Sequence, residues 1–147
     1  MTTEAGEMKR DLLASGKRAF SFLVAKGARV EVDDGAERSV LAYVLPRATF
    51  EVEYDWHEQA VFLLVCRTIE GARPGGYYMF ARQRVRVHLL QALESAGLAD
   101  EPLRAELRGA TRRSGAAAMA DQLAVLSAVL AGHFDAVIER YDRVFQE

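Results

Sequence analysis

The chain has little of what would cross-link it or hold it in a membrane. Its 147 residues include a single cysteine, Cys66, which excludes an intrachain disulfide and any metal site built from several cysteines. The longest apolar run covers residues 60–66, far short of the roughly 20 residues that a membrane-spanning helix needs. The charged N-terminal residues are not followed by the apolar segment of a secretory signal. We therefore expect a cytoplasmic protein with no membrane segment.

The charge of the chain has no dominant sign. There are 19 basic and 21 acidic side chains, and the net charge of −2 argues against a general nucleic-acid-binding protein. Half of the residues are apolar and 27% are charged, which is typical of a globular protein. The length is that of one ordinary domain, so the sequence predicts a single domain over residues 1–147.

No complete catalytic or cofactor-binding motif is present in the sequence. His57 and Glu58 match the start of a zinc-protease motif, but Val61 stands where the second histidine is required. Residues 15–17 match part of a phosphate-binding loop, but Asp11 replaces the first glycine of that motif. The sequence therefore predicts a protein that is not an enzyme and that needs no metal and no cofactor.

Hydrophobic periodicity divides the chain into a helix over 1–27, an antiparallel meander over 28–80 and a helical part over 81–147. The first helix covers 4–26 and ends at Gly27. Gly16 in its middle either weakens the helix or marks close packing. Residues 47–56 alternate between apolar and polar, which predicts a strand with one apolar face and one solvated, acidic face. Residues 60–69 are apolar on both faces, which predicts a central strand that is covered on both sides.

The C-terminal stretch is predicted to hold three or four helices. One begins at Asp100, a residue type that caps helices, and a longer one ends at Gly132. Because the strands are consecutive and the helices flank them, the fold class is α+β. We expect an antiparallel sheet of four or five strands. The N-terminal helix should pack on one face of this sheet, and the C-terminal helices should cover part of the other face.

The meander is the acidic part of the chain. Residues 31–58 hold eight acidic and two basic side chains, a net charge of −6. A row of carboxylates on one solvated strand face would steer a basic partner, and tryptophan is enriched at interface hot spots. The predicted partner-binding residues are Glu51, Glu53, Asp55, Trp56 and Glu58. For Trp56 the alternative is a core position, because it is in phase with the apolar residues of the strand.

The segment after the meander is basic. Residues 67–113 hold nine basic and five acidic side chains, a net charge of +4. Its arginines either pair internally with the acidic meander or form a second docking surface; the candidates are Arg82, Arg84, Arg86, Arg104 and Arg108. Aromatic residues do not alternate with these arginines, so a platform for single-stranded nucleic acid is not predicted. The loop 73–78, which contains Tyr77 and Tyr78, is a further candidate binding surface.

Three segments together resemble a group of known proteins. They are the first helix with Phe20–Leu23, the strand 48–56 with its hairpin return, and the segment 123–135. This arrangement resembles that of small, largely uncharacterised bacterial proteins with a helix–meander–helices layout, some of which are thought to be immunity or antitoxin partners in toxin systems. The resemblance implies a non-enzymatic protein that binds a partner protein stoichiometrically. It carries no functional residue over to this chain.

Two alternatives stay open at this level. The protein is a subunit or adaptor of a larger bacterial assembly, such as a defence or secretion complex, that docks through the arginine-rich segment. In the other alternative it is an enzyme with a site near Asp55, His57 and Glu58, where carboxylates and an imidazole stand close in sequence. Self-association is compatible with all three readings.

Overall fold

The N-terminal helical segment begins at a side-chain cap and is interrupted once. In the computed structural model, which describes residues 3–146, the Thr3 hydroxyl accepts a hydrogen bond from the backbone N–H of Gly6 and so caps α1 (Glu4–Ala19). Phe20 is fully buried and separates α1 from the short α2 (Ser21–Ala25), so the predicted helix over 4–26 is two helices. Gly27 ends the segment with a φ of 99°, as its position predicted.

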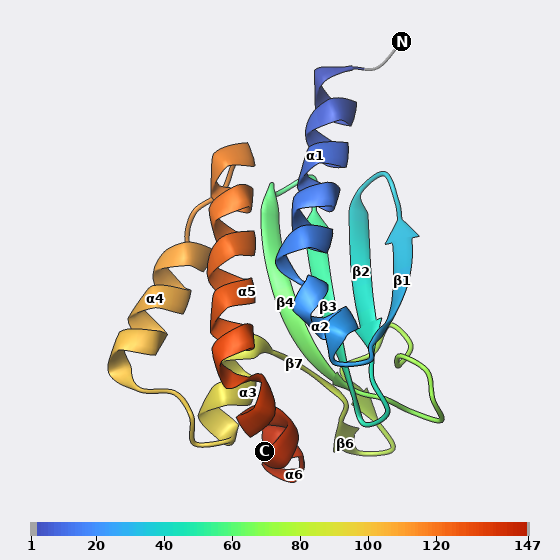
Figure 1. Ribbon diagram of the computed structural model, residues 1–147, viewed down its shortest axis with the longest axis vertical. Helices are drawn as coiled ribbons and strands as arrows, with labels where there is room; N and C mark the ends of the chain where they lie inside the picture. Colours follow the sequence, from blue (N-terminus) through green and yellow to red (C-terminus); the bar gives the residue numbers. More distant parts are fainter. Residues whose placement is uncertain (1–2, 147) are drawn as a thin grey trace.

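The meander forms a five-stranded antiparallel sheet in the order β1-β2-β3-β4-β7 (Figure 1). Its strands are β1 (Arg29–Asp34), β2 (Arg38–Val44), β3 (Ala48–Asp55), β4 (Ala60–Arg67) and β7 (Arg86–His88). The predicted α+β fold with an antiparallel meander is confirmed. The meander predicted over 28–80 is wrong at its end, because β5 (Met79–Phe80) pairs with β6 (Gln83–Arg84) outside this sheet.

The fifth strand of the sheet lies in the stretch predicted to be helical. Arg86 and Val87 of β7 stand opposite Cys66 and Val65 of β4, and all four are buried. The segment alternates in a strand pattern, but only its three residues 86–88 pair with β4. A strand of this length is set by its buried neighbour on β4 more than by its own periodicity.

Four helices follow β7: α3 (Leu89–Ser95), α4 (Glu101–Thr111), α5 (Ala116–Glu139) and α6 (Tyr141–Val144). Asp100 caps α4 as predicted, and its carboxylate accepts a hydrogen bond from the backbone N–H of Leu103. The predicted helix end at Gly132 is wrong, because α5 continues to Glu139. Leu130 and Phe134 are buried on either side of Gly132, and this packing outweighs the low helix propensity of glycine.

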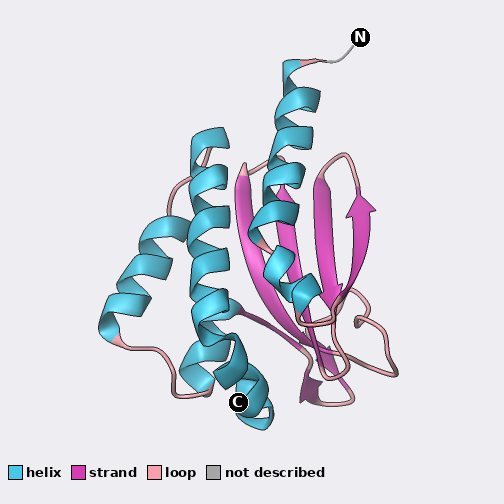
Figure 2. Ribbon diagram, in the orientation of Figure 1, coloured by secondary structure: helices cyan, strands magenta, loops and turns pink. Residues whose placement is uncertain are grey.

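The helices pack on one face of the sheet. One continuous core joins residues of α1 and α5 to the same set of sheet side chains, such as Leu41, Phe50 and Leu63, and α1 also contacts α5 (Figures 1 and 2). The expectation that the C-terminal helices cover the opposite face is therefore wrong. That opposite face is nevertheless buried at Ala42 and Leu64, as the apolar pattern of β4 predicted. We refer to it below as the loop face, because the connection between β4 and β7 covers it.

A close approach seats α1 on the sheet. The Tyr54 hydroxyl donates a hydrogen bond to the backbone carbonyl of Leu12 over 2.9 Å. The same hydroxyl occupies the space where a side chain at Gly16 would lie. Of the two roles predicted for Gly16, close packing is confirmed.

One helix, α5, is long and apolar enough to cross a membrane by length and composition alone. Half of its most apolar window is buried inside the protein, and core helices of soluble proteins meet the same criterion.

Candidate functional site

A buried ion-pair cluster lies at the centre of the loop face. Glu51 on β3 is 2% exposed, and its carboxylate accepts hydrogen bonds from Arg86 Nε over 2.7 Å and from Arg73 Nε over 2.8 Å. A third bond comes from Arg86 Nη2 over 3.0 Å. We call these three residues the Glu51 cluster. The expectation that Glu51 lies on a solvated acidic face is wrong, because two arginines from later in the chain fold over it.

The Glu51 carboxylate is ionised in this environment. Burial by itself raises the pKa of Glu51, but the hydrogen bonds and charges of Arg86 and Arg73 outweigh burial and leave the pKa lowered. Cys66 lies beside the cluster in the interior, and burial raises the pKa of its thiol well above the ordinary value. Cys66 is thus an inert thiol rather than a nucleophile.

Arg86 also holds the loop that follows β4. Its Nη1 donates to the carbonyls of Gly75 and Tyr77 over 2.7 and 2.6 Å, and its Nη2 donates to the carbonyl of Pro74 over 3.3 Å. The predicted internal pairing of an arginine with the acidic meander is therefore confirmed for Arg86. One guanidinium thus joins the sheet to three backbone carbonyls of the loop.

The other four arginines predicted for the second docking surface do not join Arg86 on one face. Arg82 lies in the turn between β5 and β6 with a φ of 66°, and Arg84 donates to the backbone carbonyl of Gln146. Arg104 on α4 pairs with Glu94 over 3.4 Å, and Arg108 is an exposed residue of the same helix. The five arginines predicted as a second docking surface are thus divided between the hairpin, the sheet and the helical layer.

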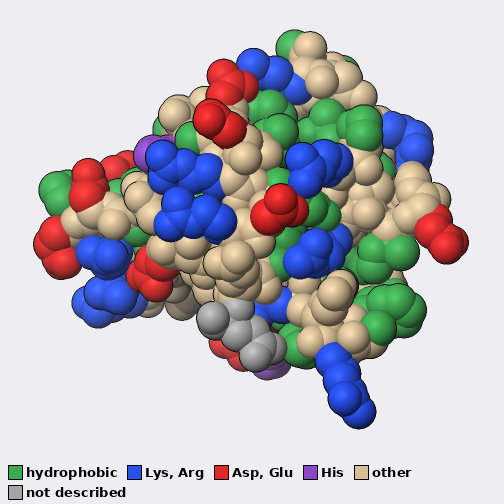
Figure 3. All heavy atoms as spheres, turned by 90° about the horizontal axis from the view of Figure 1, so that it is seen from below, with side chains coloured by type: hydrophobic (Ala, Val, Ile, Leu, Met, Phe, Trp, Pro, Cys, Tyr) green, Lys and Arg blue, Asp and Glu red, His purple; other side chains and the backbone are tan. Residues whose placement is uncertain are grey.

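Four consecutive large side chains are exposed at the end of the loop. Tyr77, Tyr78, Met79 and Phe80 are between 38% and 51% exposed, and we call them the hairpin patch. The rings of Tyr77 and Phe80 stack with centroids 5.3 Å apart. The hairpin lies at the underside of the molecule in Figure 1, and Figure 3 shows apolar and basic side chains next to one another on that side.

Next to the hairpin patch the loop face is charged. Arg38 on β2 pairs with Glu53 on β3 over 2.8 Å, and Tyr78 lies with both around a hollow of about 100 Å³. Partial burial raises the pKa of the Tyr78 phenol, and the charge of Glu53 adds to this effect. The side chain of the predicted site residue Glu53 is only 14% exposed, and it already has a partner in the chain.

A second hollow, of about 680 Å³, opens at the end of β3. It is lined by Glu37, Arg38, Asp55, His57 and Glu58. The Asp55 carboxylate accepts a hydrogen bond from the backbone N–H of Glu58 over 3.0 Å, which fixes the turn. Arg38 lines both hollows, so Tyr78 of the hairpin patch, the Arg38–Glu53 pair and the Asp55–Glu58 turn lie along one surface.

Trp56 does not belong to that surface. It is half-buried on the helix side of the sheet, where it stacks on Tyr54 at 5.1 Å between ring centroids. Its indole N–H donates to the hydroxyl of Ser39 over 2.9 Å, and the Lys9 ammonium lies 5.4 Å from its ring centre. The prediction that Trp56 shares a binding surface with Asp55 and Glu58 is wrong, because adjacent residues of a strand point to opposite faces.

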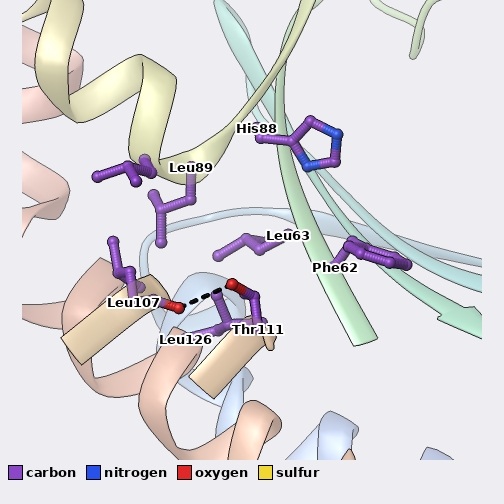
Figure 4. Close-up of a pocket in the computed structure, with 8 residues that line it drawn as sticks. Phe62, Leu63, His88, Leu89, Leu107, Thr111 and Leu126 are labelled. Carbon is purple, nitrogen blue, oxygen red and sulfur yellow. Dashed lines mark hydrogen bonds between the residues drawn. The ribbon is translucent and has the colours of Figure 1, made fainter. Parts of the chain in front are cut away.

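An apolar pocket of about 340 Å³ lies on the far side of β4 (Figure 4). It forms where β4 extends past the short β7, which pairs only with Leu64–Cys66. In Figure 4 leucines from β4, α3, α4 and α5 point toward one another, and the rings of His88 and Phe62 lie to one side. Sequence reasoning missed this pocket because its residues come from five elements spread over residues 62–126.

The apolar pocket offers no reactive constellation. The Thr111 hydroxyl donates to the carbonyl of Leu107 over 3.0 Å, so it is occupied within its own helix. Burial lowers the pKa of His88, which keeps its imidazole neutral near neutral pH. Among residues 3–146, no three His, Cys, Asp or Glu side chains are grouped so that they could hold a metal ion.

Comparison with known proteins finds no match. No protein-family model, no curated protein and no solved structure is similar to this chain. The geometry of the loop face is therefore the basis for assigning a function.

Proposed function

We propose that this protein is a non-enzymatic binding protein that holds a partner protein, in the manner of an immunity protein or antitoxin, through the loop face of its sheet. The observation that carries this proposal is the hairpin patch. Large apolar patches at the surface of a protein are typical of interaction sites, and aromatic residues are enriched at interface hot spots. Four such side chains stand next to one another here, each at least 38% exposed.

The loop that carries the patch is held before any partner arrives. Arg86 and Arg73 connect it to the buried carboxylate of Glu51, and Arg86 bonds three loop carbonyls. A binding loop that is already ordered loses less conformational entropy on association. This supports a role in which Glu51 positions the binding loop and does not touch the partner.

The surroundings of the patch suit the polar rim of an interface. Arg38, Glu53, Asp55 and Glu58 lie on the same surface, and the acidic side chains there keep the predicted preference for a basic partner. The apolar centre would supply most of the affinity, and the charged rim would raise the rate of association.

The test compares two exposed sites. The double variant Met79→Ser/Phe80→Ser removes the apolar centre, and Val24→Ser alters an equally exposed apolar residue on α2. Tagged wild-type protein is used to isolate the partner from the organism that encodes it, and the purified partner is then titrated against all three proteins by calorimetry. We expect one-to-one binding by wild type and Val24→Ser, and at least about tenfold weaker binding by the double variant. Equal affinities for wild type and the double variant would exclude the hairpin patch as the binding site.

An enzyme with its site at the end of β3 is the second candidate. The observation that favours it is that Asp55, His57 and Glu58 line one hollow. General acid–base chemistry needs an imidazole or carboxylate positioned against a substrate, and this hollow offers both groups. The effect of replacing His57 separates the two candidates and is predicted in the Discussion.

A further inference from the structure

The outer edge of the sheet is a strand without a neighbour. Within residues 3–146, β1 pairs with β2 on one side and with no strand on the other. Five of its six residues are exposed, including Val30 at 38% and Val32 at 50%. An edge of this length, with unpaired backbone groups and exposed apolar side chains, can add another strand.

The registers show which backbone groups of β1 point outward. Leu45 N–H bonds the carbonyl of Ala48 and Trp56 N–H bonds that of Glu37, so the odd-numbered residues of β2 bond to β3. The even-numbered residues of β2 therefore bond to β1, opposite its residues 29, 31 and 33. Val30 and Val32 consequently direct their N–H and C=O groups away from the sheet.

The unpaired edge of β1 is complementary to the same edge of a second copy of the chain. An antiparallel pairing about a two-fold axis through Glu31 places Val30 opposite Val32 of a second copy. The backbones of these valines then form four hydrogen bonds across the axis. On the other face of the strand the same register places Arg29 opposite Asp33 of the second copy, twice, as oppositely charged pairs.

Neighbouring registers fit less well. A shift toward the N-terminus uses the N–H of Ala28, which already bonds the carbonyl of Leu23 over 3.0 Å. A shift toward the C-terminus places Glu31 opposite Asp33 of the second copy, and like charges directly opposite are destabilising. In the register through Glu31 the two Glu31 side chains also meet at the axis, so the advantage of this register is its two Arg29–Asp33 pairs, in which Arg29 also keeps its own Glu31 at 2.7 Å.

We infer that this protein forms a symmetric dimer in which β1 pairs antiparallel with β1 of a second copy, so that the two sheets become one continuous sheet. β1 and β7 are opposite edges of the sheet, and the connection that carries the hairpin patch ends at β7. The connection also contacts β1, where the Gly71 carbonyl accepts a hydrogen bond from Arg29 over 3.2 Å, but the hairpin patch follows at residues 77–80 on the way to β7. The dimer therefore leaves the hairpin patch free and presents it twice.

The pairs between Arg29 and Asp33 of the second copy can be tested by reversing one charge at a time. Arg29→Asp and Asp33→Arg each place like charges opposite one another at two positions, so each variant alone should be monomeric. An equimolar mixture of the two variants restores opposite charges at both positions and should form a heterodimer. Molar mass is measured by sedimentation velocity over a series of concentrations for wild type, each variant and the mixture. We expect a dimer for wild type, and a dissociation constant at least about tenfold higher for each single variant.

Two controls keep the test independent of folding. Val32→Pro removes an outward donor but no hydrogen bond to β2, so it should give a folded monomer. Arg112→Asp makes the same charge change at an exposed position after α4 and should leave the dimer intact. A monomeric wild type at high micromolar concentration would overturn the inference. Single variants that dimerise like wild type, or a mixture without heterodimer, would overturn it too.

Discussion

At the scale of single residues, Glu51 shows how a charge changes its role with its surroundings. In the alternating strand 47–56 it has the same place as Glu53 and Asp55, and all three share the loop face. Glu53 and Asp55 stay partly exposed on that face, whereas Arg86 and Arg73 close over Glu51. A buried carboxylate is retained only where cations and hydrogen bonds compensate for its lost hydration, and this cluster supplies both.

Replacing Glu51 by Gln should destabilise the fold strongly. The substitution leaves the Arg86 guanidinium buried without its counter-charge, and breaking a buried pair on one side typically costs 3–5 kcal/mol, so we expect a loss of about 3 kcal/mol. Glu53→Gln is the matched control, because its partner Arg38 is 63% exposed and surface pairs contribute about 1 kcal/mol or less. Urea denaturation at neutral pH measures both; equal small losses would show that the cluster does not stabilise the fold.

The same carboxylate makes stability depend on pH. The folded pKa of Glu51 is lowered from the ordinary value of 4.5, so its stabilising effect is complete above that value and is lost as the pH falls through the folded pKa. The free energy of unfolding of wild type should therefore decrease below about pH 4.5 more steeply than that of Glu51→Gln. Urea titrations at a series of acidic pH values test this, and parallel curves for the two proteins would contradict it.

His57 is expected to have little influence on partner binding. It is an exposed residue of the β3–β4 turn, and exposed substitutions rarely change stability by more than about 0.5 kcal/mol. His57→Ala should leave the affinity for the isolated partner, and the biological activity of the protein, within a few-fold of wild type. A general base typically contributes 10²–10⁴-fold. If His57→Ala lowered the biological activity by that factor while the circular dichroism and the partner affinity stayed unchanged, the end of β3 would be an active site.

At the scale of secondary-structure elements, tertiary contacts decide how two glycines behave inside helices. Gly16 in α1 lies against the Tyr54 hydroxyl, whereas nothing lies within 4 Å of the position that a side chain would occupy at Gly132 in α5. Intrinsic propensity favours alanine at both positions by about 0.5–1 kcal/mol. The two helices therefore respond to the same substitution with opposite signs.

Gly16→Ala should destabilise the protein by about 1–3 kcal/mol, because the added methyl group displaces Tyr54 and its hydrogen bond to Leu12. Gly132→Ala should stabilise it by about 0.5–1 kcal/mol. Thermal unfolding of both variants against wild type gives the two signs. Stabilisation by Gly16→Ala would show that α1 does not sit as close to the sheet as this structure has it.

At the scale of the whole molecule, both faces of one sheet are covered by different kinds of structure. Helices cover one face, and a loop anchored by a buried ion pair covers the other. Trp56 lies among the contacts of the helix side and Cys66 is buried on the loop face, so the two residues report on opposite layers.

We expect the two layers to unfold together, because both depend on the same sheet. The fluorescence of Trp56 and the accessibility of the Cys66 thiol to a thiol-specific reagent should change at the same urea concentration. Both should also coincide with the loss of the far-ultraviolet circular dichroism signal. Labelling of Cys66 before the fluorescence change would indicate that the loop opens while the helices remain packed.

Local patterning was sufficient for much of this fold. The α+β class, four of the five strands of the sheet, the cap at Asp100 and the stop at Gly27 follow from periodicity, turn chemistry and residue type. These features depend on interactions between residues that are near in sequence, so the sequence by itself predicts them. The same reasoning failed at Gly132 and at β7, where burial against distant residues outweighs local propensity.

What only the tertiary structure decided is the placement of charge and the side of the sheet that each segment covers. Alternation places Glu51, Glu53 and Asp55 on one face, but it does not say that Arg86, 35 residues later, returns to bury the first of them. The exposed hairpin patch and the unpaired edge of β1 are likewise consequences of strand order and of how the loop folds back. The physical reason is that solvent exposure and the net effect of a charge depend on partners brought together through space, and sequence spacing does not encode those partners.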